Sequence, residues 1–205
     1  MKVLGLSFAL ATLAVATPVP SSASASAPSS FRVGKVAYGG SGCPQGTLNV
    51  DISSDGRILP IHFGKEFAAS VGPNSDPADS RKNCQLNFDL QFSPGYQYTV
   101  LSTDYTGFAD LNSGVKGKVK STYYFSGEQD QATAGFTLNG PFTGQYTKHD
   151  DVALAVWSPC GSSSLLNVNT EVALTPLTAK DTGLLTTDKA SAKFTHSLYI
   201  NWRQC

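Results

Sequence analysis

The chain has 205 residues, a formal net charge of zero, and only 15% charged residues beside 40% hydrophobic ones. The apolar fraction suffices for one buried core, and Ser, Thr, Asn and Gly must supply most of the polar surface. No dense run of Lys and Arg is visible, so neither nucleic acid nor an anionic membrane surface is expected as a partner.

The N-terminal segment is typical of an export signal. Lys2 precedes an apolar run over residues 3–15, and residues 14–16 fit the small-x-small pattern of signal cleavage. The run is shorter than the ~20 residues of a membrane-spanning helix. We therefore expect a signal peptide over residues 1–16, no membrane insertion, and a secreted, extracellular protein.

A Pro/Ser/Ala-rich linker is expected over residues 17–30, because this segment has no charge, no aromatic residue and no periodicity. Residues 31–205 suit a single domain by their length. We expect this domain to be a monomer.

Period-two alternation of apolar and polar residues dominates the domain and is typical of half-buried antiparallel strands. In residues 83–92, Cys84, Leu86 and Phe88 alternate with polar residues. The remaining predicted strands cover residues 47–53, 57–63, 96–103, 105–111, 115–125, 132–138, 152–157, 165–174 and 193–202. About ten short strands separated by turn signals predict an all-β, antiparallel β-sandwich, with the jelly roll as one candidate topology.

Two local features qualify this pattern. Pro60 lies inside a predicted strand, and since proline cannot donate to a ladder, it favours an edge position. Residues 65–71 are the one segment for which a short helix is considered.

Four cysteines, Cys43, Cys84, Cys160 and Cys205, predict two disulfides, because their number is even and the protein is exported. Three pairings are possible. We favour Cys43–Cys84 with Cys160–Cys205, since each bridge would then close one half of the domain.

Several segments of the domain, all four cysteines included, are similar to one known family. The segments are residues 42–47 (GCPQGT), 81–86 (RKNCQL), 94–98 (PGYQY), 120–127 (KSTYYFSG), 157–161 (WSPCG), 166–170 (LNVNT) and 202–205 (WRQC). They resemble a family of fungal and bacterial secreted proteins of about 200 residues, known only as a domain of unknown function. The resemblance implies secretion, an all-β fold and paired cysteines, and it implies no activity.

Glu171 is the one weak candidate for a catalytic residue. Many hydrolases with jelly-roll folds cleave polysaccharides with two carboxylates, and Glu171 alternates with Thr170 and Val172, so that it can project from a sheet. The Asp-Thr-Gly tripeptide at residues 181–183 is interpreted as a turn, because aspartic proteases need two such aspartates.

The histidines His62, His149 and His196 have no metal-ligand spacing, so no metal and no cofactor is expected. His196 lies on an apolar strand face, which favours a buried histidine with satisfied hydrogen bonds over a ligand.

Tyrosines and tryptophans are numerous for a chain with so little charge. Tyr96, Tyr98, Tyr124 and Trp157 are the candidate binding residues, because exposed aromatic rings stack on sugars and anchor protein partners. The alternative is that most of these rings fill the core of the sandwich.

Three functions remain open at this point. The first is a non-catalytic protein that binds an extracellular surface, either a cell-wall polysaccharide or a host or neighbour protein, which in a fungus would include an effector role. The second is a secreted polysaccharide hydrolase that uses a carboxylate such as Glu171. The third is a structural component of the wall or matrix.

Overall fold

The computed structural model describes residues 27–153, 155–177, 180, 182–186 and 194–205. The predicted signal peptide, and most of the predicted linker, lie outside the described residues. The described elements are β1 (Phe31–Gly39), β2 (Leu48–Val50), β3 (Ile58–Phe63), β4 (Ala69–Val71), the short 3₁₀ helix η1 (Pro77–Ser80), β5 (Arg81–Leu111), β6 (Lys116–Phe125), β7 (Gln131–Asn139), β8 (Phe142–Asp151), β9 (Gly161–Thr175), β10 (Gly183–Thr186) and β11 (Phe194–Gln204).

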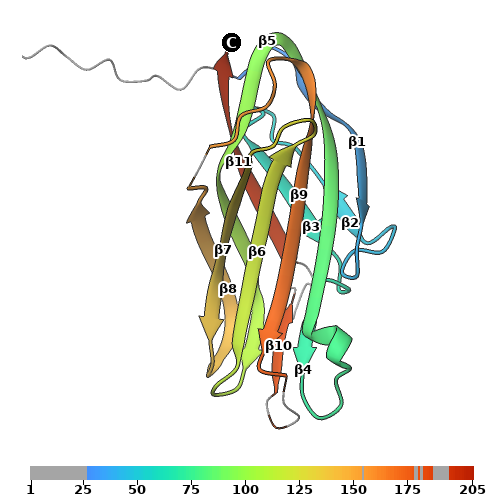
Figure 1. Cartoon of the computed structure of the whole chain (residues 1–205), viewed down its shortest axis with the longest axis vertical. Coiled ribbons are helices and arrows are strands. Elements are labelled where there is room, and N and C mark those ends of the chain that lie inside the picture. Colours follow the sequence, from blue (N-terminus) through green and yellow to red (C-terminus); the bar gives the residue numbers. More distant parts are fainter. Residues whose placement is uncertain (1–26, 154, 178–179, 181, 187–193) are drawn as a thin grey trace, which may run out of the picture.

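The strands form two antiparallel layers, which confirms the predicted β-sandwich (Figure 1). The layer that we call the front sheet has the strand order β1-β5-β9-β6-β7. The other layer, the back sheet, has the order β8-β5-β11-β3-β2, and β10 joins β5 beyond β11 and also pairs with β4.

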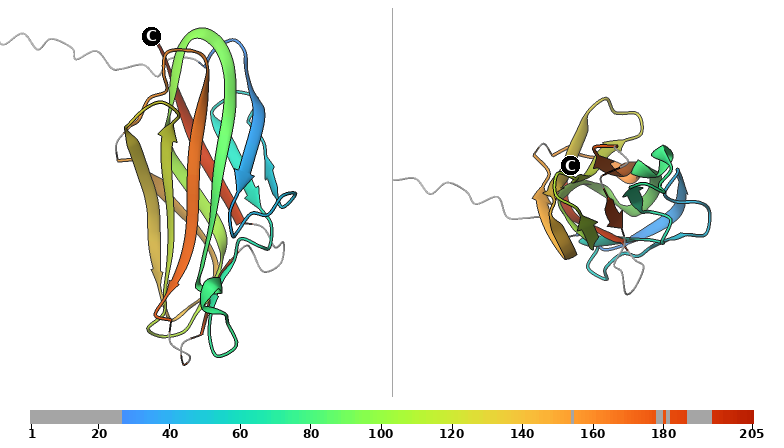
Figure 2. Two further views of the ribbon diagram at one scale, coloured as in Figure 1. Left: turned by 45° about the vertical axis from the view of Figure 1, so that its right-hand side comes forward. Right: turned by 90° about the horizontal axis from the view of Figure 1, so that it is seen from below.

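Strand β5 belongs to both layers because it turns over at the upper end of the sandwich, the end at which the C-terminus lies (Figure 2). Its residues 81–91 pair with β9, and its residues 96–106 pair with β11. The turn falls at Pro94-Gly95, where Gly95 has φ 84°. This positive φ favours glycine, so the turn signal in the sequence marks the position at which one layer becomes the other.

Three local expectations are wrong. Residues 65–71 form no helix. The side chains of Phe67, Ala69 and Val71 point inward in alternation, as in a strand, and residues 69–71 are β4. Residues 152–157 form no strand where they are described. Strand β3, which contains Pro60, is not at an edge, since it pairs with both β2 and β11. Its ladder to β2 covers only residues 61–63, which follow the proline.

Both predicted disulfides are present with the favoured pairing. Cys43 and Cys84 lie in the hydrophobic core. Cys160 and Cys205 are exposed and join the segment before β9 to the last residue of the chain. One bridge therefore fastens the start of the domain to β5, and the other fastens its end.

A small polar network lies inside the core around His196, as the sequence predicted. The Nε2 atom of His196 lies 2.9 Å from the Tyr123 hydroxyl, and its Nδ1 atom lies 3.2 Å from the Thr170 hydroxyl. The Tyr105 ring stacks on the imidazole, with centroids 4.5 Å apart. Burial lowers the pKa of His196 to about 3, so this ring is neutral in the folded protein at ordinary pH.

Candidate binding face

A continuous row of uncharged polar side chains crosses the outward side of the front sheet, which we call the front face. The register aligns Asn87 of β5 with Asn167 of β9, Asn167 with Tyr124 of β6, and Tyr124 with Gln131 of β7. Tyr124 points outward because its neighbour Tyr123 is buried, and successive strand residues face opposite sides. The row places one aromatic ring among amide groups on neighbouring strands.

Asn167 holds the centre of this row. It is only 3% exposed, its carbonyl oxygen accepts a hydrogen bond from the Asn87 amide, and its own amide donates to the Ser126 hydroxyl at 2.9 Å. Because its polar atoms are engaged, Asn167 orients the half-exposed Asn87. The centre of the row is therefore ordered before any ligand arrives, which lowers the entropic cost of binding.

The next row toward the lower end continues the polar surface. Gln85 of β5 aligns with Asn169 of β9, and Asn169 aligns with Thr122 of β6 and through it with Thr133 of β7. Asn169 and Thr122 are half-exposed, and neither side chain hydrogen-bonds to another described residue. These groups offer donors and acceptors to a ligand.

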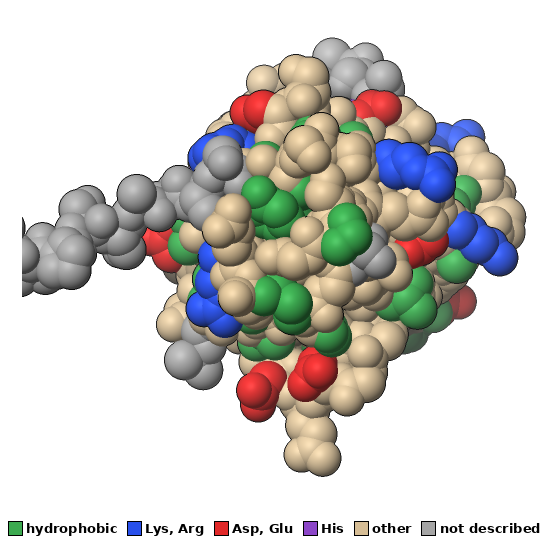
Figure 3. Space-filling view, turned by 90° about the horizontal axis from the view of Figure 1, so that it is seen from above, with side chains coloured by type: hydrophobic (Ala, Val, Ile, Leu, Met, Phe, Trp, Pro, Cys, Tyr) green, Lys and Arg blue, Asp and Glu red, His purple; other side chains and the backbone are tan. Residues whose placement is uncertain are grey.

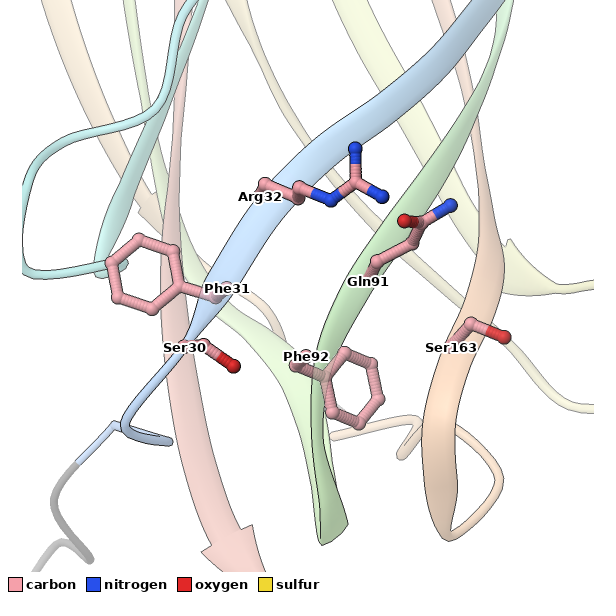
Figure 4. Close-up of a pocket in the computed structure, with 6 residues that line it drawn as sticks. All are labelled: Ser30, Phe31, Arg32, Gln91, Phe92 and Ser163. Carbon is pink, nitrogen blue, oxygen red and sulfur yellow. The ribbon is translucent and has the colours of Figure 1, made fainter.

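A hollow of about 430 Å³ opens near the upper end of the front face, between β1 and β9 (Figure 4). Arg32 of β1, Gln91 of β5 and Ser163 of β9 are aligned by the register and line this hollow. The Gln91 amide donates to the Asp89 carboxylate at 2.7 Å, whereas Arg32 has no ion pair with any described residue. The complete lining is Ser30, Phe31, Arg32, Gln91, Phe92 and Ser163.

A second hollow, of about 310 Å³, lies over β6 and β7 in the lower half of the front face. Lys118 and Lys120 border it from β6, and Thr133 and Thr137 border it from β7. Between the two threonines lies Gly135, at which an added Cβ atom would come within 2.2 Å of the Val119 carbonyl oxygen. The backbones of β6 and β7 are therefore too close for any side chain at this position.

Three lysines share the front face of β6, although they were not among the predicted site residues. Lys116, Lys118 and Lys120 are exposed and alternate with buried positions. No ion pair joins any of them to another described residue. The signal in the sequence was the period-two spacing Lys-Gly-Lys-Val-Lys, which puts all three ammonium groups on one side of a strand.

The outward side of the back sheet carries the opposite charge. Asp104 and Asp110 lie on β5, and Asp151 lies at the end of β8. Asp104 accepts hydrogen bonds from the Tyr199 hydroxyl and from His149 Nδ1, both at 2.6 Å. The formal net charge is zero, but positive side chains therefore prevail on one outer face of the sandwich and negative side chains on the other.

The four predicted binding aromatics do not act together. Tyr98 is fully buried and packs against Trp202 with ring centroids 5.2 Å apart, so its interpretation as a binding residue is wrong. Tyr96 and Trp157 are half-buried near the upper end, where Arg203 covers the Trp157 ring at 3.8 Å. That end presents separate hydrophobic groups among uncharged polar atoms, with Lys and Arg as well as Asp and Glu side chains at its margins (Figure 3). Of the four aromatic residues, only Tyr124 lies in the polar row with Asn87 and Asn167.

Glu171 lies on the front face, but its carboxylate is engaged. Arg81 Nε donates to Glu171 Oε2 at 2.7 Å, and a second guanidinium nitrogen contacts the same oxygen. Its cross-strand neighbours are Asn83 and Lys120, so neither neighbour supplies the second carboxylate that glycoside hydrolysis needs.

The described residues contain no group of three or more His, Cys, Asp or Glu side chains placed to hold a metal ion. Asp181 of the predicted Asp-Thr-Gly turn lies outside the described residues. No described helix has the length and apolar character that a membrane span requires.

Comparison with solved structures gives only weak likenesses. TmCBM27, a carbohydrate-binding module that recognises mannan, matches with 8% identity and a TM-score of 0.31 over 86% of this chain and 100% of that one. TmCBM61, solved with β-1,4-galactotriose, matches with 8% identity and a TM-score of 0.26 over 88% and 92% of the two chains. Eiger TNF from S. frugiperda matches with 12% identity and a TM-score of 0.22 over 55% and 64%. At these TM-scores the likenesses carry no argument about a ligand.

Comparison of sequences gives a stronger result. An uncharacterized secreted protein of Arthroderma benhamiae is 39% identical over 180 residues, which are 87% of this chain and 73% of the relative. Together with the two disulfides, this relative identifies the chain as a secreted, extracellular protein. The family model "Domain of unknown function (DUF4360)" matches residues 29–205. The chain therefore belongs to the DUF4360 family of secreted proteins.

Proposed function

We propose that the protein binds an extracellular polysaccharide through its front face and carries out no catalysis there. The observation that carries this proposal is the ordered row of Asn87, Asn167 and Tyr124. Amides donate and accept hydrogen bonds at the same time, as the hydroxyl groups of sugars require, and a tyrosine ring can stack on the apolar side of a sugar ring.

The shape of the front face favours a polymer over a small ligand. The polar rows run across neighbouring strands, and the two hollows open beside different strands, one between β1 and β9 and the other over β6 and β7. A small ligand is normally enclosed in one deep pocket, whereas an extended chain can contact several shallow sites along a sheet.

The composition of the face favours a polysaccharide over a protein partner. Stable protein interfaces have an apolar, largely dehydrated centre. Of the large hydrophobic residues that are strongly exposed among those described, Leu101, Leu165 and Leu177, only Leu165 lies on the front face, where it is 46% exposed. Its surroundings are amides, hydroxyls and charged groups, which suit a hydroxyl-rich ligand.

Replacing Tyr124 with alanine is expected to weaken retention on the bound polysaccharide by about tenfold, because one aromatic stacking contact is lost. The measurement is a depletion isotherm with chitin, cellulose, β-1,3-glucan and polygalacturonate as separate matrices. The matched control is Tyr199→Ala, since Tyr199 is also half-buried but lies on the back sheet. An equal loss of binding in the two variants, or retention on none of the four matrices, would contradict the proposal.

A further inference from the structure

We propose that the polysaccharide bound by the front face is acidic and that the lysine row of β6 selects it. This inference rests on the proposed function and adds the chemical class of the ligand. The lysine row consists of Lys116, Lys118 and Lys120. The acidic groups of the ligand would be carboxylates or sulfates borne by successive sugars.

The spacing of the lysine row suits a repeating polyanion. Alternate residues of a strand lie about 6.7 Å apart, so the outer two of the three lysines are separated by about 13 Å at their Cα atoms. Their long, flexible side chains act as mobile point charges and do not impose the bidentate geometry that arginine does. Such a row can follow a chain that carries one negative group on each sugar.

The acidic residues of the front face do not neutralise the lysine row. Glu171 lies next to Lys120 in the register, but its carboxylate is paired with Arg81. Asp89 accepts a hydrogen bond from Gln91 near the upper hollow, where Arg32 adds a further cation without an ion pair to a described residue. The front face therefore keeps an excess of positive charge.

The lower hollow gives the lysine row a place for a sugar. Lys118 and Lys120 stand on one side of it, and the hydroxyls of Thr133 and Thr137 stand on the other. Asp150 also borders this hollow, but its Oδ2 atom accepts a hydrogen bond from the Gly135 backbone amide at 2.6 Å. An anionic sugar seated here would place its acidic group toward β6 and its hydroxyl groups toward β7.

The opposite charge of the back sheet makes the selection directional. Asp104, Asp110 and Asp151 would repel a polyanion from that side when His149, which contacts Asp104 and Asp151, is neutral. Because the protein has no net charge, general attraction does not account for binding, and only the arrangement of charges on the front face would favour an acidic chain.

The test compares polygalacturonate with the same polymer after methyl esterification, which removes the charge but keeps the sugar backbone. Dextran sulfate forms a second anionic arm, and duplex DNA forms an arm for a non-saccharide polyanion. We expect binding to polygalacturonate or dextran sulfate to be at least about tenfold tighter than to the methyl ester, and to weaken as salt rises, because charged contacts on a surface are screened.

The variant that tests the lysine row is Lys116→Gln/Lys118→Gln/Lys120→Gln, which should lose about tenfold or more in affinity for the acidic polymer. The control, Arg57→Gln/Lys65→Gln/Lys148→Gln, changes the net charge equally at exposed positions elsewhere and should bind like the wild type. Circular dichroism establishes that both variants are folded.

The outcomes separate this inference from the proposed function. If a neutral glycan binds and Tyr124→Ala weakens that binding while the lysine variant is unaffected, the inference is overturned and the proposed function stands. If the control variant loses as much affinity as the lysine variant, or if DNA binds as tightly as the acidic glycans, selection by the lysine row is refuted. If no glycan binds, both fail.

Discussion

Replacing Cys43 and Cys84 together with alanine is expected to lower the free energy of unfolding by about 4 kcal/mol, the largest single effect that the structure predicts. The bridge joins residues 41 positions apart, so its removal gives the unfolded chain much more conformational freedom. Both cysteines are also buried in the core, so the loss of their sulfur atoms adds a packing defect. Urea unfolding followed by tryptophan fluorescence measures the change.

The second disulfide supplies the comparison. The Cys160–Cys205 bridge spans a similar 45 positions, but both of its cysteines are exposed. The double variant Cys160→Ala/Cys205→Ala should therefore lose stability without the packing defect, and mild reduction of the wild type should open this bridge first. A Cys43→Ala/Cys84→Ala protein as stable as the wild type would show that this bridge does not fasten the core.

The second large effect is a loss of stability in acid that originates at His196. The pKa of His196 is about 3 in the folded protein and about 6.5 in the unfolded chain. Between these pH values the imidazole is protonated in the unfolded chain and neutral in the folded protein. The free energy of unfolding should therefore decrease by about 1.4 kcal/mol for each unit by which the pH is lowered through this range. Between neutral pH and pH 4.5, the free energy of unfolding of the wild type should decrease by about 3 kcal/mol more than that of His196→Gln.

His149 provides a control, because its pKa is shifted in the opposite direction to that of His196. Its hydrogen bond to Asp104 raises the pKa of His149, so the stability that it contributes is present below the ordinary histidine pKa and is lost as the pH rises through the folded-state value. His149→Gln should therefore be less stable than the wild type in acid and similar to it at alkaline pH. Parallel unfolding curves at several pH values test both residues, and a wild type that matches His196→Gln at every pH would contradict the assignment.

The alternation of residues was enough to predict the sandwich. Residues 83–92 alternate so regularly that their inward side was evident, and Pro94-Gly95 marked the turn of β5. The pattern missed β1 and β8, which have 9 and 10 residues, because β1 has no fully buried residue and β8 has only one. Other segments that it missed or misassigned are short. For example, β4 has only three residues and becomes a strand through its pairing with β10, which lies far away in the sequence.

The candidate site was less predictable because it depends on register. Tyr96 and Tyr98 share one phase of the alternation, and only the three-dimensional packing of Phe92, Phe125 and Trp202 around the Tyr98 ring shows that Tyr98 is in the core. Asn87, Asn167 and Tyr124 come from three strands, and no local pattern brings them into one row. The lysine row is local to β6 and was visible in the sequence, but each lysine by itself is also typical of an ordinary solvated strand.

The most direct test of binding by the front face is an NMR titration of ¹⁵N-labelled protein with a soluble oligosaccharide of the polysaccharide that retains the protein. The largest shifts should fall on the side-chain amides of Asn87 and Asn169 and on the backbone amides of β6 and β9. The amides of β8 and β11 in the back sheet should remain in place. Shifts confined to the back sheet, or to the upper end around Trp157, would contradict binding by the front face.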